Sequence, residues 1–313
     1  MKTISKIKAD LRRLRTEQPN PAAQDLDRKS AIEIVRLINH EDASVAGAVR
    51  KALPQIARAV DMIADGIRHG GRLIYVGAGT SGRLGALDAS ECPPTFGIPP
   101  GTVQFVIAGG DQALAHETES SEDSAELGRT EIARRKPGKH DVVIGITASG
   151  RTPFVIAAMQ YARSRGAKTV ALVCNRKSPL ERACHLAIVT EVGPEVLAGS
   201  SRMKAGTAHK MVLNMLSTAA MARLGFVYGS LMVGVHPKNE KLVQRATAIL
   251  ERATGADRTA ASSALAASNN RTPVALVMLA ANVSRSRAVA VLKQSAGHVR
   301  NAIARAGPAS SRR

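Results

Sequence analysis

Two hydroxyl-rich glycine loops are the residues of this chain whose types and spacing most clearly indicate chemistry. The first reads Gly77-Ala-Gly-Thr-Ser-Gly82, and the second reads Ile146-Thr-Ala-Ser-Gly-Arg-Thr-Pro153; each follows a short apolar run. Loop amides and a helix N-terminus together bind anions, and Ser or Thr hydroxyls add further donors. One such loop is equally well explained as an ordinary helix N-cap. Two of them at neighbouring strand ends predict a phosphorylated small ligand.

The first loop also fits the GxGxxG fingerprint of dinucleotide-binding proteins. That interpretation needs an acidic residue at the end of the next strand, about 20 residues on. Here the next apolar run ends in Ile107-Ala-Gly-Gly110, and Asp111 comes late. We therefore favour a phosphate site over a dinucleotide site.

A third hydroxyl-rich stretch runs from Ala198 to Thr207 and precedes a long helical pattern. Ser200, Ser201 and Lys204 are its candidate ligand contacts. A lysine in the first turn of a helix opposes the helix dipole, and a bound anion would relieve that misfit. The alternative is an ordinary N-cap followed by a basic first turn.

One carboxylate, Glu91, stands shortly after the first loop, in the stretch LDASECPPTFG. Leu84, Leu87 and Glu91 are spaced i, i+3, i+7 and so share one helix face. Pro93 is expected to end this helix near Cys92. On an apolar face Glu91 would be partly desolvated, which raises a carboxyl pKa and suits a general acid near neutrality. The alternative is an exposed glutamate at a helix end.

A second group of carboxylates follows the Gly109-Gly110 turn, between His116 and Glu126. Its spacing alone does not select a catalytic member, and the candidates are Glu117, Glu119, Glu122 and Asp123. The alternative is a capped helix with acids in its first turn.

Composition narrows the possible partners. The formal net charge is +19, but Lys and Arg are spread along the chain with only 2% aromatic residues beside them. This favours a generally basic proteome, or the attraction of an anionic small molecule, over a nucleic-acid surface. The cysteines Cys92, Cys174 and Cys184 form no CxxC pair, and no histidine spacing indicates a metal site. Residues Met1 to Arg15 are charged, so we expect no signal peptide, and we expect a reducing cytoplasm.

A parallel sheet is the element that must position these loops. Short β-rich runs alternate with helix-length segments, which predicts an α/β fold with helices on both faces of the sheet. The expected strands are Leu73–Val76, Val103–Ile107, Asp141–Ile146, Thr169–Val173 and Leu186–Val189. Ligands of such sheets bind outside the carboxyl ends of the strands.

Helical segments flank the predicted sheet. We expect residues 1–50 to form an N-terminal helical segment, residues 51–230 the ligand-binding and catalytic domain, and residues 237–306 a C-terminal helical subdomain. Pro54 is expected to kink or split a helix over Ser44–Ile67. Further helices are expected at Lys204–Leu224 and, without a break, at Arg285–Ala306.

Long stretches of the chain resemble the N-acetylmuramic acid 6-phosphate etherase family. They read YVGAGTSGRLGALDASECPPTFG, VIAGG followed by SSED, TASGRTPFV, and GPEVLAGSSRMKAGTAHKMVLNMLST. The resemblance continues upstream through EQPNPAAQDLDRKSAIEIVRLIN and downstream through VHPKNEKLVQRA, and it is weakest in the first dozen residues and after about Leu250. It extends more loosely to the glucokinase regulatory protein, which binds sugar phosphate without turnover.

The resemblance implies a sugar-isomerase (SIS) domain of three α-β-α layers with a small, ubiquitin-associated-like C-terminal bundle. It also implies a cytoplasmic homodimer that recycles peptidoglycan sugars with no metal or organic cofactor, no nucleic-acid partner and no membrane partner. The family reaction is a lyase-type cleavage, by elimination and then hydration. It converts N-acetylmuramic acid 6-phosphate and water to N-acetylglucosamine 6-phosphate and D-lactate.

By the motif match, the two family carboxylates fall on Glu91 and Glu122. Glu122 is implied as the base that removes the C2 hydrogen, and Glu91 as the acid that protonates the departing lactate. Where the family usually reads EGAED, this chain reads Glu119-Ser-Ser-Glu-Asp123, without the glycine. The expected substrate contacts are Gly79, Thr80, Ser81, Glu119, Ser149, Gly150, Thr152, Ser200, Ser201 and Lys204. Which loop holds the phosphate stays open.

Two other functions compete with this interpretation. A non-catalytic sugar-phosphate sensor is disfavoured because both acidic positions are retained. A DNA-binding regulator would place a helix-turn-helix before the sugar domain, whereas residues 1–50 match the etherase pattern instead.

Overall fold

The computed structural model describes residues 14–116, 119–235, 237 and 239–307 of the chain. These residues form two compact units. Unit 1 contains the residues up to Ala89 together with Gly101–Ser217, and unit 2 contains Ser90–Pro100 together with the chain from Thr218 onward. Two helices, α4 (Gly79–Phe96) and α9 (Lys204–Arg223), run from one unit into the other.

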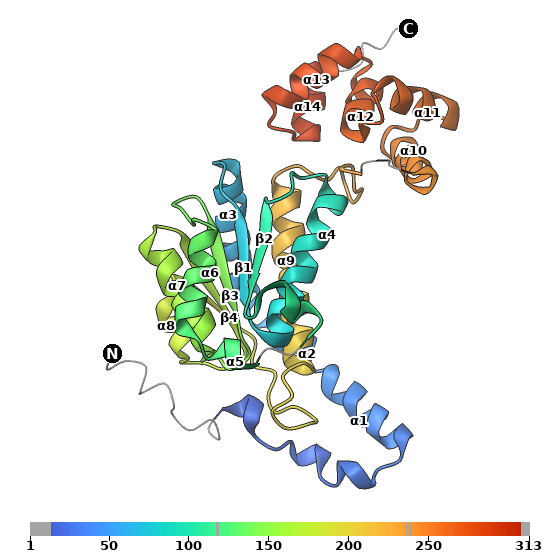
Figure 1. Ribbon diagram of the computed structural model, residues 1–313. Helices are drawn as coiled ribbons and strands as arrows, with labels where there is room; N and C mark the ends of the chain where they lie inside the picture. Colours follow the sequence, from blue (N-terminus) through green and yellow to red (C-terminus); the bar gives the residue numbers. More distant parts are fainter. Residues whose placement is uncertain (1–13, 117–118, 236, 238, 308–313) are drawn as a thin grey trace. The chain divides into compact units, whose positions relative to one another are not determined.

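Unit 1 is built on a five-stranded parallel sheet, seen edge-on in Figure 1, with strand order β2-β1-β3-β4-β5. The strands are β1 (Leu73–Gly77), β2 (Val103–Ile107), β3 (Val142–Ile146), β4 (Lys168–Val173) and β5 (Leu186–Val189). All five predicted strands are thus confirmed. Nearly continuous apolar sequence is what a sheet covered on both faces requires.

Helices cover both faces of this sheet (Figure 1). One face carries Ile74, Val76 and Val143, which pack with Phe154 and Met159 of α7 in one core cluster. The helices of this unit besides α4 and α9 are α1 (Ala31–Asp42), α2 (Val45–Arg50), α3 (Leu53–Arg68), α5 (Glu119–Glu122), α6 (Ala125–Arg134), α7 (Pro153–Ser164) and α8 (Pro179–Ala183). The predicted three-layer α/β architecture is confirmed.

The other face of the sheet receives α4 at close range. A Cβ placed on Gly85 of α4 would lie 3.0 Å from Cβ of Tyr75 and 3.4 Å from Cδ1 of Ile146. A glycine at this position therefore lets the helix backbone approach the β1–β3 pair closely.

The chain order of the strands creates a topological switch point between β1 and β3. After β1 the chain adds β2 on one side, and it then returns to add β3 on the other side. Gly77 of β1 pairs with Ile146 of β3, so both strands end at the same level. The two glycine loops therefore leave neighbouring strand ends, as the sequence predicted, at the position where such sheets bind ligands.

Prolines act differently in two helices. The predicted break at Pro54 is confirmed, because α2 ends at Arg50 and Pro54 lies in the first turn of α3. The predicted end of α4 near Cys92 is wrong, because the helix continues through Pro93 and Pro94 to Phe96. A proline removes a donor but keeps its carbonyl acceptor. The amide of Gly97 donates to the carbonyl of Pro93 at 2.9 Å, which closes this last turn.

Unit 2 packs its helices around an aliphatic core that includes Leu250, Leu265, Leu276 and Val291. The helices are α10 (Glu240–Thr254), α11 (Arg258–Ala267), α12 (Thr272–Ala281), α13 (Arg285–Gln294) and α14 (Val299–Ala306). The unbroken helix expected over 285–306 is therefore wrong. Ala296 and Gly297 have φ values of 49° and 84°, which separate α13 from α14.

Within the described ranges, no single helix is long and apolar enough to cross a membrane. One pair, α12 with α13, meets the length and composition test together and is bent by 108° at its break.

Candidate functional site

The first glycine loop leads from β1 into α4 and holds Ser81 against a buried imidazole. The Ser81 hydroxyl lies 3.3 Å from Nδ1 of His209 in α9, and Nε2 of His209 lies 3.6 Å from Sγ of Cys174. His209 is fully buried, and this burial lowers the pKa of its imidazole to about 4. The imidazole is therefore neutral near pH 7, and it fixes the Ser81 hydroxyl at the loop.

The third hydroxyl-rich stretch approaches this loop from α9. A Cβ placed on Gly206 would lie 3.6 Å from Cγ2 of Thr80 and 3.6 Å from the carbonyl oxygen of Ser201. Ser200 and Ser201 are both half-buried. The first and third stretches that the sequence singled out are thus brought together in unit 1.

Glu122 is the carboxylate that the fold places on the first loop. It ends the short helix α5, which lies near the carboxyl edge of the sheet in Figure 1. A Cβ placed on Gly79 would come within 3.0 Å of Oε1 of Glu122, so a glycine here allows the close approach. Gly79 also has φ of 50°, a conformation that favours glycine. The side chain of Glu119, another expected contact, lies outside the described residues.

The second glycine loop, between β3 and α7, is a chain of hydroxyls. The Thr147 hydroxyl lies 2.9 Å from the Thr152 hydroxyl and 3.3 Å from the Ser149 hydroxyl, which also accepts a bond from the amide of Arg151. Nε of Arg151 is buried and makes no hydrogen bond among the described residues. No side chain caps the N-terminus of α7 in this part of the chain. These features match an anion site.

Gly150 in the same loop has φ of 68°, and a Cβ there would lie 2.4 Å from Cβ of Ser178. This loop therefore requires a glycine for both its backbone conformation and the space beside it.

Lys204 has protein partners instead of an open anion site. Its ammonium forms an ion pair with Glu41 of α1, and its side chain is only 3% exposed. The fully buried Glu195 accepts the amide protons of Lys204 and Ala205, at 2.9 Å each. The anion that the sequence analysis expected at the start of α9 is thus supplied internally. Glu41 comes from a distant segment of the chain, whereas Glu195 stands only nine residues before Lys204.

Glu91 has surroundings different from those expected. Its side chain is exposed, and Leu87 on the same face is 44% exposed. The expected burial of Glu91 on an apolar face is therefore wrong for the described chain. The buried carboxylate of α4 is Asp88, which accepts hydrogen bonds from Tyr75 Oη at 2.8 Å and Ser217 Oγ at 3.1 Å.

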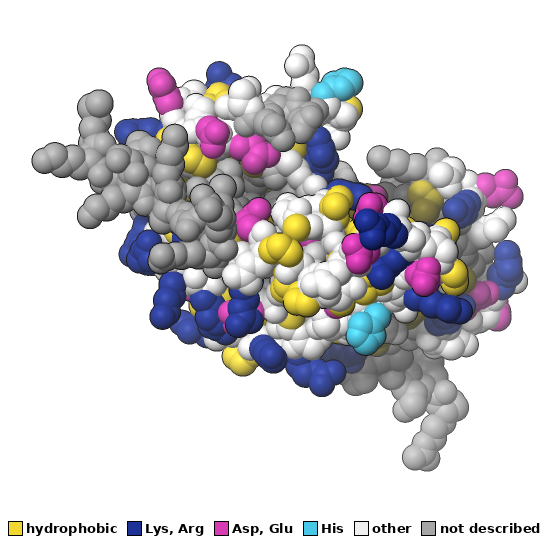
Figure 2. Space-filling model, turned by 90° about the horizontal axis from the view of Figure 1, so that it is seen from below, with side chains coloured by type: hydrophobic (Ala, Val, Ile, Leu, Met, Phe, Trp, Pro, Cys, Tyr) yellow, Lys and Arg dark blue, Asp and Glu magenta, His cyan; other side chains and the backbone are white. Residues whose placement is uncertain are grey.

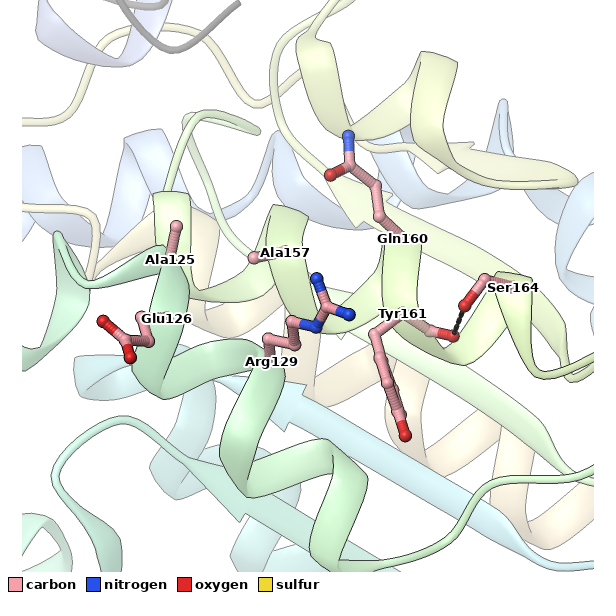
Figure 3. Close-up of a pocket in the computed structure, with 7 residues that line it drawn as sticks. All are labelled: Ala125, Glu126, Arg129, Ala157, Gln160, Tyr161 and Ser164. Atoms are coloured by element: carbon pink, nitrogen blue, oxygen red, sulfur yellow. Dashed lines mark hydrogen bonds between the residues drawn. The ribbon is translucent and has the colours of Figure 1, made fainter. Parts of the chain in front are cut away.

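A separate cavity lies between α6 and α7, with a volume of about 570 Å³ (Figure 3). The guanidinium of Arg129 lies 5.6 Å from the ring centre of Tyr161, and the Ser164 hydroxyl donates to the Tyr161 carbonyl at 2.7 Å. None of the residues singled out from the sequence lines this cavity, so the candidate site stays at the sheet edge.

Figure 2 shows Lys and Arg side chains scattered over one face, with Asp and Glu side chains among them. Within the described ranges, no group of three or more His, Cys, Asp or Glu side chains is arranged to hold a metal ion.

Comparison with known proteins gives two matching family models. One describes the N-terminal SIS domain of the glucokinase regulatory protein and matches residues 55–163. The other describes the SIS domain and matches residues 137–219.

Several relatives match nearly the whole chain. The N-acetylmuramic acid 6-phosphate etherase of Actinobacillus pleuropneumoniae serotype 5b (strain L20) is 48% identical over 293 residues, which are 94% of this chain and 96% of that protein. The enzyme of the same name from Vibrio vulnificus (strain YJ016) is 49% identical over 297 residues, 95% of this chain and 99% of that protein. A solved phosphoheptose isomerase from Francisella tularensis is 19% identical, with a TM-score of 0.45, over 60% of this chain and 98% of that one.

Proposed function

The chain belongs to the N-acetylmuramic acid 6-phosphate etherase family, and we propose that it cleaves the D-lactyl ether of this sugar phosphate. The products are N-acetylglucosamine 6-phosphate and D-lactate, and the role is the recycling of peptidoglycan amino sugars. One observation carries this proposal. The carboxylate of Glu122 lies beside Gly79, which follows strand β1 at the switch point of an SIS-type sheet.

The proposed reaction is that of a carbon–oxygen lyase followed by hydration. In the open-chain aldehyde, Glu122 removes the C2 proton. The electron pair of the broken C2–H bond then forms the C2–C3 double bond as the C3–O bond to lactate breaks. Glu91 gives its proton to the departing lactate oxygen. Water then adds at C3 with Glu91 as base, and a proton returns to C2. Such proton transfers require each carboxyl group within hydrogen-bond reach of its own atom.

In this proposal, the two glycine loops bind different parts of the substrate. The second loop binds the phosphate, because it offers hydroxyls, an uncapped helix N-terminus and the buried Nε of Arg151. The first loop binds the sugar beside Glu122, since a phosphate dianion next to that carboxylate would be repelled. Thr80 and Ser81 would then hold sugar hydroxyls.

We also propose that Glu91 acts on the site of a second copy of the chain. Glu91 follows Gly79 by twelve residues in α4, a rise of roughly 18 Å along the helix axis. Glu122 lies next to Gly79 in unit 1, whereas Glu91 belongs to unit 2. A homodimer with two-fold symmetry would exchange the two Glu91 side chains.

A cytoplasmic location is part of the proposal. Cys92, Cys174 and Cys184 all lie in the described residues, where they are buried and form no disulfide. Burial raises the pKa of both Cys174 and Cys184 to about 12. Cysteines kept out of disulfides fit a reducing compartment.

The activity is tested by incubating the purified protein with N-acetylmuramic acid 6-phosphate and measuring D-lactate with a stereospecific dehydrogenase. We expect stoichiometric D-lactate and N-acetylglucosamine 6-phosphate. Tight binding of the sugar phosphate without lactate release would contradict the proposal and indicate a sensor.

The shared site is tested by mixing two inactive variants, Glu91→Gln and Glu122→Gln, after joint refolding or co-expression. Random pairing makes about half of the dimers mixed, and each mixed dimer has one intact site, so about a quarter of the wild-type activity should return. Each variant refolded alone is the control. No recovery in a preparation shown to contain mixed dimers would place both carboxylates in one chain.

A further inference from the structure

Unit 2 contains a cavity that holds Glu91 together with residues from much later in the chain. Its volume is about 630 Å³, and it lies between the segment 91–100 and the start of the C-terminal helices. Apolar side chains make much of its wall, among them Ile98, Met232, Val235 and Leu242. Cavities that bind small ligands typically have this size, with apolar walls and a few polar groups.

Glu91 and Arg245 are the two charged residues that line this cavity. Both side chains are exposed, and among the ion pairs of the described residues none includes Arg245. Leu242 and Arg245 are three residues apart in α10 and so share one face of the helix. Ala246 and Ile249 turn instead into the core of the helical bundle. The Arg245 guanidinium is therefore open to a carboxylate from outside the chain.

We propose that this cavity binds the lactyl arm of the substrate and that Arg245 pairs with the carboxylate of that arm. The inference rests on the proposed function, in which Glu91 protonates the ether oxygen. A lactyl ether carries a carboxylate, a methyl group and the ether oxygen on one carbon. Arginine binds carboxylates through two parallel hydrogen bonds. The guanidinium, the apolar wall and the acid of this cavity correspond to these three groups.

The role assigned to Arg245 is to determine specificity. N-acetylglucosamine 6-phosphate has no lactyl arm, so its binding and the removal of its C2 proton do not need the guanidinium. Lactate release needs it, because the arm must be held with its ether oxygen at the acid. Arg245 therefore distinguishes the ether substrate from the product sugar.

The test compares Arg245→Gln with Arg245→Lys and with Arg252→Gln. Arg252 is an exposed arginine of the same helix that does not line the cavity, so it is the matched control. Two reactions are measured for each protein: D-lactate release from N-acetylmuramic acid 6-phosphate, and deuterium exchange at C2 of N-acetylglucosamine 6-phosphate in D₂O.

We expect Arg245→Gln to lower kcat/KM for lactate release by about 10- to 100-fold, the usual effect of losing a hydrogen bond to a charged group. Arg245→Lys should keep part of the rate, and Arg252→Gln all of it. Exchange at C2 should be unchanged in all three variants.

Lactate release by Arg245→Gln within about twofold of wild type would overturn the inference. An equal loss of lactate release and C2 exchange would also overturn it, because it would indicate a structural effect. A wild-type protein that exchanges the C2 proton but releases no lactate would refute the proposed function itself, before any variant is compared.

Discussion

The two candidate carboxylates have contrasting environments. Glu122 lies beside the backbone of a glycine loop whose neighbouring hydroxyls already have partners, such as Ser81 with His209. Glu91 lies on an exposed turn of α4 just before two prolines, beside a cavity with apolar walls. The polar groups of the first region are held in place by other residues of the same chain, whereas the second region exposes its carboxylate to solvent.

This difference suits the two carboxylates to different steps of the proposed reaction. Holding a charged sugar and removing its C2 proton need fixed donors and a fixed base, which the sheet edge of unit 1 offers. Protonating a leaving group in a site closed from water requires an acid that becomes enclosed when the substrate is bound. Glu91 is exposed in the described chain, so under the proposed mechanism the enclosure would come from a second copy of the chain or from the substrate itself.

The largest effect is expected at Glu122. Glu122→Gln keeps the size of the side chain but removes the base, and general acid–base groups typically contribute about 10²- to 10⁴-fold in rate. We expect kcat for lactate release to fall by this factor while the phosphosugar still binds, measured by isothermal titration. Asp123→Asn, an exposed neighbour, serves as the control. Near-normal turnover by Glu122→Gln would remove the distinction between the two regions.

A second effect is expected on the stability of the protein at low pH, because His209 is buried at the sheet edge. Burial lowers the pKa of His209 to about 4, against about 6.5 for an ordinary histidine. The unfolded chain therefore binds this proton more tightly, and stability present above pH 6.5 is lost as the pH falls toward 4. We expect a loss of up to about 3 kcal/mol, at about 1.4 kcal/mol for each unit of pKa shift.

The measurement is urea unfolding at several pH values. The variant His209→Asn cannot titrate, so its unfolding free energy should fall less between pH 6.5 and 4. His116→Asn, at an exposed histidine, is the matched control for the substitution itself. Equal slopes for wild type and His209→Asn would show that the buried imidazole does not set the acid stability of this region.

The smallest effect is expected at Ser81, the hydroxyl that His209 holds at the loop. Ser81→Ala removes one neutral hydrogen bond, worth about 0.5–1.5 kcal/mol, so KM should rise about two- to tenfold with kcat little changed. Ser164→Ala, at the far end of α7, is the control. A fall in kcat at constant KM would place Ser81 in the chemical step and not in binding.

Much of the fold follows from local pattern. The sequence predicted the five strands, the break before Pro54 and the two loops at neighbouring strand ends. These features were predictable because runs of apolar residues, prolines and glycines affect the backbone within a few residues of themselves. The predicted end of α4 before Pro93 was wrong. The helix continues through both prolines because the Pro93 carbonyl still accepts a hydrogen bond, from the amide of Gly97. The break at Gly297 was missed although this glycine was its visible signal.

The candidate site was less predictable, because its contacts join distant parts of the sequence. The Glu41 partner of Lys204 comes from another segment of the chain, as does the His209 contact of Ser81. The histidine stood inside GTAHKM, in a stretch already marked for its hydroxyls, but burial is not visible in a sequence. The burial expected for Glu91 was wrong, because the sequence of α4 does not show which of its side chains other parts of the chain cover.

The division of labour between the two carboxylates is tested most directly by deuterium exchange at C2 of N-acetylglucosamine 6-phosphate, followed by NMR in D₂O. If Glu122 is the C2 base and Glu91 the acid for lactate, Glu91→Gln should exchange the proton at a rate near wild type while releasing no lactate. Glu122→Gln should do neither. Loss of exchange in Glu91→Gln, or normal exchange in Glu122→Gln, would contradict the account.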